Sequence, residues 1–176
     1  MSHFNRPYMT GVETEYIRQA VDGGKISGNG EFTHRCQEFF ERRYGFGKCL
    51  LTTSCTDALE MAAILSGVGP GDEVIVPANA YIASILSITE NNLTPILIEP
   101  RLENLQIDAS LIERAITPRT RAILLVHMYG CCSWTSTIQE ICNRYHLKVI
   151  EDNAQAVGCL AETKHGACHT GSLGDA

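Results

Sequence analysis

The segment Thr52–Leu59 joins a short apolar run to a helical pattern and carries small hydroxyl residues, among them Ser54 and Thr56. Backbone N–H groups at the start of a helix, together with the helix dipole, form a binding site for anions. The alternative is that Ser54 or Thr56 only caps the helix. The Gly and Lys of a P-loop are absent. The segment therefore predicts either a phosphate-binding turn that is not a P-loop or a residue that only caps the helix.

An acidic residue, Asp152, follows the apolar pair Val149-Ile150 after one intervening residue. Burying a carboxylate without a partner is costly. A cationic ligand group, such as a protonated ring nitrogen, would offset that cost. The alternative is a carboxylate that accepts hydrogen bonds from nearby loop N–H groups.

Tyr81 and His127 also follow apolar runs that are typical of strands. An aromatic ring in such a place can stack on a flat ligand, although a tyrosine that is simply packed is the alternative. His127 can bond to or stack on a ligand, or be a core histidine with satisfied partners.

The elements that must position these residues alternate between strands and helices. We expect strands at 49–52, 73–76, 95–98, 121–126 and 148–150, and helices at 12–21, 32–44, 56–65, 82–90, 108–116 and 136–146. Asp108 is the expected cap of its helix, and Ser136 with Gln139 forms an expected capping box. Crossover helices imply an α/β fold with a mainly parallel sheet covered on both faces. The last 15 residues lose this rhythm and predict a small antiparallel hairpin.

Ligands of such a sheet bind at the carboxyl ends of its strands. That rule selects five loops, at 53–56, 77–81, 99–100, 127–130 and 151–155. A phosphate cradle, a stacking aromatic ring, a histidine and a carboxylate for a cation would then meet at one edge. This combination is suited to pyridoxal 5'-phosphate.

Composition excludes several other classes of protein. The net charge of −6 disfavours general nucleic-acid binding. No apolar run approaches the roughly 20 residues of a membrane span, and the N-terminus has no apolar signal core, so we expect a cytoplasmic protein. The eight cysteines form no CxxC pair, so we expect reduced thiols that act mostly as small buried apolar groups. Only 165–169 is faintly metal-like, and we expect no metal there.

The whole chain resembles the pyridoxal-phosphate-dependent sugar aminotransferases of the DegT/DnrJ/StrS type. The resemblance runs from about residue 4 to the end, including an opening arm at 25–30. It is carried by Ser-Cys-Thr-Asp-Ala-Leu (54–59), Pro-Gly-Asp-Glu-Val-Ile-Val-Pro (70–77), Tyr-Ile-Ala-Ser (81–84), Val-His-Met-Tyr-Gly (126–130) and Ile-Glu-Asp-Asn-Ala-Gln-Ala (150–156). It implies the large domain of the aspartate-aminotransferase-like fold, called fold type I.

The resemblance also implies roles for the candidate residues. Thr56 and Asp57 would form the phosphate cradle, with Ser54 supporting the turn. Tyr81 would stack on the pyridine ring, Asp152 would pair with the ring nitrogen as the catalytic carboxylate, and Gln155 would bond the phenolic oxygen. His127 is a further candidate contact of the cofactor.

Two positions depart from the family pattern. Cys55 stands where the family has Gly in the phosphate turn, which is tolerable at negative φ, and its thiol near an aldehyde is a candidate reactive group. Ala80 stands where the family often has Thr, so any contact of that hydroxyl is lost.

The family chemistry requires a Schiff-base lysine. The four lysines of this chain are Lys25 in the arm, Lys48 and Lys148 at strand starts, and Lys164 in the hairpin. None matches the family position, so we expect an N-terminal part of a longer aminotransferase that is inactive alone. We expect residues 1–30 to be an arm with the first helix and residues 31–176 to be an incomplete cofactor-binding domain.

The predicted reaction is transamination of a nucleotide-linked keto sugar, of the dTDP-4-keto-6-deoxyhexose type, in polysaccharide biosynthesis. Glutamate is the expected amino donor, and the full-length protein is expected to be a homodimer. The alternatives are a family member that does not transaminate, such as a dehydratase or a cofactor-binding protein, and a Rossmann nucleotide-sugar oxidoreductase. The last requires a GxGxxG turn after the first strand, and Gly67–Gly71 follows a helix instead.

Overall fold

The computed structural model describes residues 6–164 and 166–176. The chain divides into two compact units, one ending at Leu51 and the other running from Thr52 to Ala176. Compactness alone does not assign a role to a unit, so the division into an arm at 1–30 and a cofactor-binding domain at 31–176 stays a prediction.

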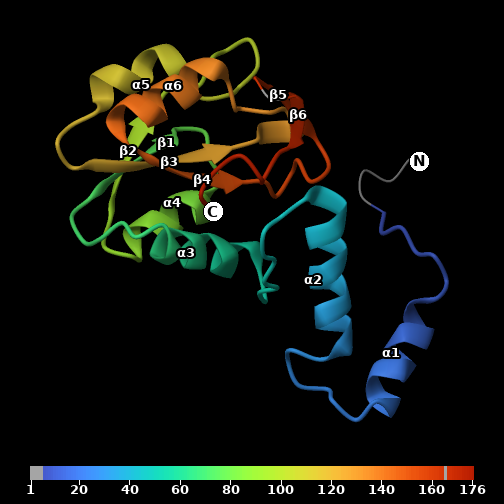
Figure 1. The fold of residues 1–176 in the computed structure, drawn as a ribbon. Helices are drawn as coiled ribbons and strands as arrows, with labels where there is room; N and C mark the ends of the chain where they lie inside the picture. The colour runs from blue at the N-terminus through green and yellow to red at the C-terminus, as the bar shows by residue number, and fades with distance from the viewer. Residues whose placement is uncertain (1–5, 165) are drawn as a thin grey trace. The chain divides into compact units, whose positions relative to one another are not determined.

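A four-stranded parallel sheet forms the centre of the second unit, as predicted (Figure 1). Its strands are β1 (Glu73–Pro77), β2 (Thr94–Ile98), β3 (Thr120–Val126) and β4 (Lys148–Asp152). The order across the sheet is β2-β1-β3-β4. The chain therefore steps from β1 to one side and later returns to build the other side, which creates a switch point between β1 and β3.

Helices cover both faces of this sheet (Figure 1). One face carries α3 (Cys55–Leu65) and α4 (Ile82–Thr89), and the other carries α5 (Ala109–Ala115) and α6 (Ser136–Tyr145). No helix of the described residues combines the length and apolar character that a bilayer span requires.

The two cores follow from side chains that alternate between the faces of each strand. On β3, Ala122 and Leu124 pack in the cluster that contains Ala63 and Ile88 of α3 and α4. The next residues along, Ile123 and Leu125, pack against α5 and α6. From Ala122 to Val126 both faces of the strand are buried, so this part of it is apolar and shows no polar alternation.

Helix caps explain two of the helix boundaries. Asp108 caps α5 as predicted, with its carboxylate accepting from the Ser110 N–H. The predicted capping box at Ser136 and Gln139 is wrong, because the cap of α6 is Thr135, whose hydroxyl accepts from the Ile138 N–H at 3.2 Å. Thr135 has the extended backbone that a cap needs, whereas Ser136 is already helical.

The predicted strand at 49–52 is also wrong. The segment pairs with none of the described strands, and Leu50 and Leu51 are 57% and 45% exposed. A strand requires a neighbour for its backbone N–H and C=O groups, and this segment lies where the first unit ends.

The predicted hairpin is present as β5 (Leu160–Thr163) and β6 (Gly166–His169), which pair antiparallel. All eight cysteines are free, but only Cys142 is buried, so the expectation of mostly buried thiols is wrong. The exposed cysteines Cys36, Cys55 and Cys131 lie in α2, at the start of α3 and in a loop, outside the two cores of the sheet.

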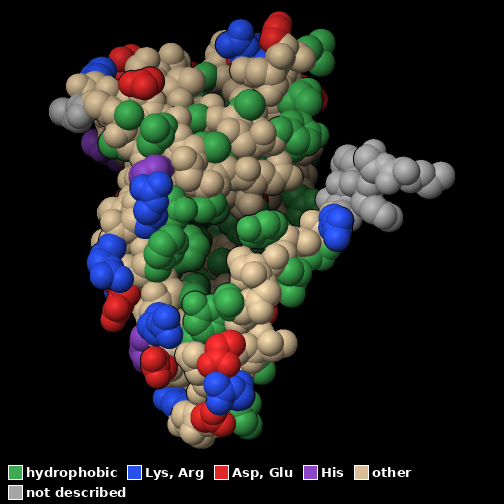
Figure 2. Space-filling model, turned by 90° about the vertical axis from the view of Figure 1, so that its right-hand side faces the viewer, with side chains coloured by type: hydrophobic (Ala, Val, Ile, Leu, Met, Phe, Trp, Pro, Cys, Tyr) green, Lys and Arg blue, Asp and Glu red, His purple; other side chains and the backbone are tan. Residues whose placement is uncertain are grey.

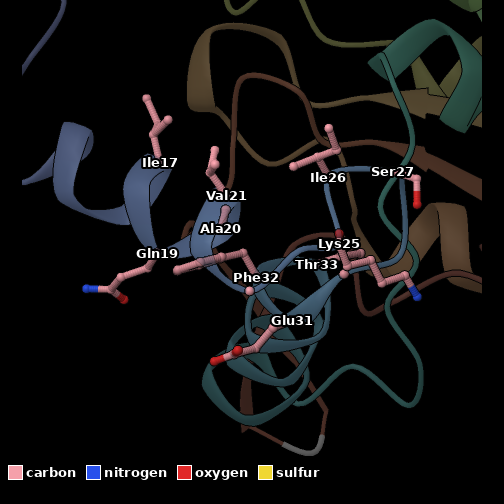
Figure 3. A pocket seen from close by; sticks show the side chains of 12 residues that line it. Ile17, Gln19, Ala20, Val21, Lys25, Ile26, Ser27, Glu31, Phe32 and Thr33 are labelled. Atoms are coloured by element: carbon pink, nitrogen blue, oxygen red, sulfur yellow. The ribbon is translucent and has the colours of Figure 1, made fainter.

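The described part of the first unit contains α1 (Glu13–Asp22) and α2 (Glu31–Tyr44). It buries little: no residue of α1 is buried, and Ile17, Val21 and Phe39 are more than half exposed. A hollow of about 370 Å³ is lined by Ile17, Ala20 and Val21 of α1, by the loop at 23–30 and by Phe32 of α2 (Figure 3). Figure 2 shows hydrophobic side chains reaching the molecular surface among charged ones.

Two leucines that differ in burial can test whether β3 lies in the hydrophobic core. Leu125 on β3 is 0% exposed and Leu102 in a loop is 88% exposed. Leu125→Ala should lower the free energy of unfolding by about 2–5 kcal/mol, because it leaves a cavity. The matched change Leu102→Ala should cost less than about 0.5 kcal/mol. Urea denaturation measures both, and equal losses would contradict the assignment.

Candidate functional site

A cavity of about 620 Å³ opens at the carboxyl ends of β1, β3 and β4. It lies where the loops after β1 and β3 lead to helices on opposite faces, the expected place for a ligand in an open α/β sheet. Six of the eight residues singled out from the sequence line it: Cys55, Thr56, Tyr81, His127, Asp152 and Gln155. The predicted loop at 99–100 contributes nothing to it.

The start of α3 forms one wall of the cavity. Ser54 caps the helix, and its hydroxyl accepts from the Asp57 N–H at 3.1 Å. Within the described residues, the N–H groups of Cys55 and Thr56 have no partner, as expected in a first helical turn. Two free donors and the positive end of a helix dipole therefore border the cavity.

Ser54 and Asp57 themselves do not line the cavity. The Asp57 carboxylate accepts from the Thr53 hydroxyl, and its N–H is used by Ser54. Both residues therefore shape the turn that presents the two free N–H groups, and a direct contact of either with a ligand stays a prediction.

Cys55 is the first residue of α3 and is not among the residues with positive φ. A side chain is therefore accommodated at a position where the family pattern has Gly. Partial burial raises the pKa of the Cys55 thiol above its ordinary value, and the negative charge of Asp152 raises it further. The thiol is protonated at neutral pH, which argues against a role as nucleophile.

Asp152 ends β4 and forms a second wall of the cavity, with only 6% of its surface exposed. Its Oδ2 accepts from the Ser84 hydroxyl at 2.7 Å, and its Oδ1 accepts from the Ala154 N–H at 3.2 Å. Among the described residues, no Lys or Arg forms an ion pair with this carboxylate. A buried negative charge without a cation favours a cationic ligand.

Tyr81 and Gln155 enter the cavity from opposite loops. Tyr81 precedes the first residue of α4 and is 71% exposed, so it is not held in the core. The Gln155 Oε1 accepts from the Tyr129 N–H at 2.7 Å. That bond orients the side chain and leaves its amide N–H groups as donors for a ligand oxygen.

His127 lies fully buried at the end of β3. Its Nδ1 accepts from the Ser133 N–H at 3.0 Å, so the proton is on Nε2, which donates to Glu151 at 2.8 Å. The ring is thus a neutral imidazole whose tautomer is set by its neighbours. Since both nitrogens are used, the ring can offer a ligand only its face or edge.

Glu151 was not singled out from the sequence, yet its carboxylate accepts four hydrogen bonds. The donors are His127 Nε2 and the N–H groups of Gly171, Leu173 and Gly174, at 2.7–2.9 Å. Burial alone would raise the pKa of Glu151, but these donors outweigh it and hold the pKa below its usual value. The ionised side chain thus joins the C-terminal segment to the floor of the site.

Three contributors to the site were missed by the sequence interpretation. Ser84 and Glu151 lie within the motifs quoted above, but each bonds to a side chain that is distant in sequence, so no local pattern shows which partner it has. Asn79 lines the cavity and has a buried Oδ1 without a partner in the described chain. Its place in the predicted loop at 77–81 was the only available signal.

Lys148 and Lys164, the lysines of the second unit, do not line this cavity. Lys148 starts β4, at the opposite end from Asp152, and pairs with Asp175 at 2.7 Å. Lys164 pairs with Glu140. Lys48 pairs with Glu41 and, contrary to expectation, does not start a strand. Lys25 borders the hollow of the first unit (Figure 3).

No group of His, Cys, Asp and Glu in the part of the chain that the structure describes could hold a metal ion. The faintly metal-like stretch at 165–169 includes His165, which lies outside the described residues.

The parallel sheet, the helices on both faces and the cavity at the switch point form the large domain of the aspartate-aminotransferase-like fold, fold type I, as the similarity to solved structures shows. Comparison with family models makes the assignment specific: residues 7–176 match the DegT/DnrJ/EryC1/StrS aminotransferase family. The chain belongs to this family.

Two curated relatives and one solved structure illustrate the similarity. A GDP-perosamine synthase of Caulobacter vibrioides is 39% identical over 96% of this chain and 44% of its own length. A dTDP-3-amino-3,6-dideoxy-alpha-D-galactopyranose transaminase of Aneurinibacillus thermoaerophilus is 45% identical over 78% of this chain and 38% of its own length. The crystal structure of NtdA from Bacillus subtilis with bound cofactor PMP has a TM-score of 0.79 and 34% identity, over 82% of this chain and 33% of that one. The chain thus spans less than half the length of these relatives.

Three of the four hydrogen bonds to the Glu151 carboxylate attach residues 171–174 to β4, and we expect this attachment to weaken at acid pH. Because the folded state lowers the pKa of Glu151, the ionised group stabilises the fold above its unfolded pKa of about 4.3, and this stabilisation is lost as pH falls through the folded pKa. Glu151→Gln should reduce the free energy of unfolding at pH 7 by roughly 1–3 kcal/mol and reduce the loss of stability in acid. Urea denaturation across pH 3–7 measures this.

Hydrogen exchange provides the local readout. The amides of Gly171, Leu173 and Gly174 should exchange faster in Glu151→Gln, because an amide side chain accepts less strongly than a carboxylate. The matched change Glu162→Gln alters an exposed residue of β5 and should leave these amides unchanged. Unchanged exchange in Glu151→Gln would refute this attachment.

Proposed function

We propose that this chain is the cofactor-binding part of a pyridoxal-phosphate-dependent aminotransferase that acts on a nucleotide-linked keto sugar. The observation that carries the proposal is the composition of the cavity. Unpartnered helix N–H groups of Cys55 and Thr56 and a buried carboxylate, Asp152, line the same space. An anion cradle together with an acceptor for a cation matches a ligand that carries a phosphate and a basic ring.

The phosphate end is supported by the donors of α3. The N–H groups of Cys55 and Thr56 and the Thr56 hydroxyl would hold the phosphate, with the helix dipole adding to the attraction. Ser54, through its cap, keeps the first turn open toward the cavity. Asp57 holds the turn from the other side through Thr53.

The ring end is supported by three side chains of different chemistry. Asp152 would hold a proton at the ring nitrogen by opposite charge, Tyr81 would stack on the ring, and Gln155 would donate to the phenolic oxygen. The chemistry that the cofactor supplies when bound is an electron sink for negative charge at the reacting carbon. The low exposure of Asp152 excludes water, which strengthens its hold on that proton.

None of the four lysines of this chain stands at the family's lysine position, and Lys148 and Lys164, the lysines of the second unit, do not line the cavity. The proposal therefore assigns binding and orientation of the cofactor to this chain. It predicts no turnover by these residues alone.

The substrate class rests on the relatives, whose names include both GDP- and dTDP-linked sugars. We propose a nucleotide-linked 4-keto-6-deoxy sugar, with a dTDP-linked one as the first to test. Glutamate is the proposed amino donor and a homodimer the proposed assembly, both from the family resemblance.

Pyridoxamine 5'-phosphate tests the proposal directly, because its binding requires no lysine. The chain should bind it saturably, and Asp152→Asn should weaken binding by roughly tenfold or more, through loss of a charge-assisted bond. The matched change Asp108→Asn keeps a helix cap outside the cavity and should leave binding unchanged. Isothermal titration calorimetry measures all three, and absent binding in the parent chain would refute the proposal.

A proline substitution tests the phosphate cradle. Cys55→Pro removes one free N–H at a helix position that accepts proline, and Ser54 before it already has the required extended backbone. Binding of pyridoxamine 5'-phosphate should fall by about tenfold, as for loss of one charge-assisted bond, whereas Cys55→Ala, which keeps the N–H, should bind as the parent does. Unphosphorylated pyridoxamine should not distinguish the two variants. If it does, the N–H does not hold the phosphate.

A further inference from the structure

Ser84 is a fully buried polar residue in the first turn of α4. Its hydroxyl donates to Asp152 Oδ2 at 2.7 Å, across 68 positions of sequence. Its backbone N–H donates to the carbonyl of Tyr81 at 2.9 Å. One turn of helix therefore touches both the residue proposed to stack on the ring and the carboxylate proposed to hold its nitrogen.

The Asp152 carboxylate is held on both of its oxygens. Ser84 donates to Oδ2 from α4, and the Ala154 N–H donates to Oδ1 from the loop after β4. The last side-chain torsion of an aspartate is broad, so an unrestrained carboxylate would adopt many orientations. Two donors from different elements restrict the plane of the carboxylate before any ligand arrives.

We propose that Ser84 is a positioning residue that sets the plane of the Asp152 carboxylate and thereby the place of a protonated ring nitrogen beneath Tyr81. This inference rests on the proposed function, and it assigns to Ser84 a role distinct from contact with the ligand. Ser84 is absent from the residues that line the cavity. Its effect on a ligand must therefore pass through Asp152.

The same helix contains a matched control. Ser87 is also 0% exposed on α4, but its hydroxyl donates to the backbone carbonyl of Ser84 and not to Asp152. Ser84→Ala and Ser87→Ala thus remove the same atom from the same helix at the same burial. Only the first removes a donor from the carboxylate.

The first measurement requires no ligand. In a chain labelled with ¹³C at aspartate carboxyl groups, the Asp152 resonance, assigned by its loss in Asp152→Asn, should shift at neutral pH in Ser84→Ala. It should stay in place in Ser87→Ala. An unchanged resonance in Ser84→Ala, or equal shifts in both variants, overturns the inference.

The second measurement is affinity for pyridoxamine 5'-phosphate. Ser84→Ala should bind about tenfold more weakly, as for loss of a hydrogen bond to a charged group, and Ser87→Ala should bind as the parent does. If the parent binds and Ser84→Ala binds equally well, the inference alone fails. If the parent binds none, the proposed function fails and the inference falls with it.

Circular dichroism establishes that each variant is folded. Should Ser84→Ala fail to fold, Ser84→Cys takes its place, since it keeps a similar side-chain volume and donates only weakly. Its expected effects on the resonance and on affinity have the same direction as those of Ser84→Ala.

Discussion

A carboxylate withdrawn from water without a cation is the constraint on which this site depends. Asp152 is buried at the end of β4, where Ser84 and the Ala154 N–H each donate to one of its carboxylate oxygens and so offset the cost of burial. Those two bonds satisfy the oxygens but leave the charge uncompensated. The site therefore has an electrostatic preference for a cation, and the helix start at Cys55 and Thr56 adds a preference for an anion in the same cavity.

The order of the sheet brings these opposite preferences together. Because all four strands are parallel, their carboxyl ends lie at one edge, and the switch in strand order between β1 and β3 leaves a space there for a ligand. His127 and Glu151, in turn, link the floor of the cavity to the C-terminal segment through hydrogen bonds that require a neutral ring and an ionised carboxylate.

Several elements could be predicted because their signals are local. The four strands of the sheet could be predicted from their apolar runs, because burial in the core selects apolar residues within a few positions. Asp108 could be predicted as a cap because a helix cap bonds only to the next few residues. Three predictions were wrong. The apolar run at 49–52 has no strand beside it, the cap of α6 is the residue before the one predicted, and most cysteines lie outside the cores. Neighbours that are distant in sequence decided each of these.

Strand ends and helix starts are encoded by short patterns, so the class of fold, four of the loops that border the cavity and six of the residues that line it could be predicted from the sequence. The three-dimensional packing adds that Ser54 and Asp57 do not line the cavity, and that Ser84 bonds to Asp152 and Glu151 to His127. A side-chain hydrogen bond between elements depends on where packing places them to within an ångström, and no pattern of residue types along the chain specifies that.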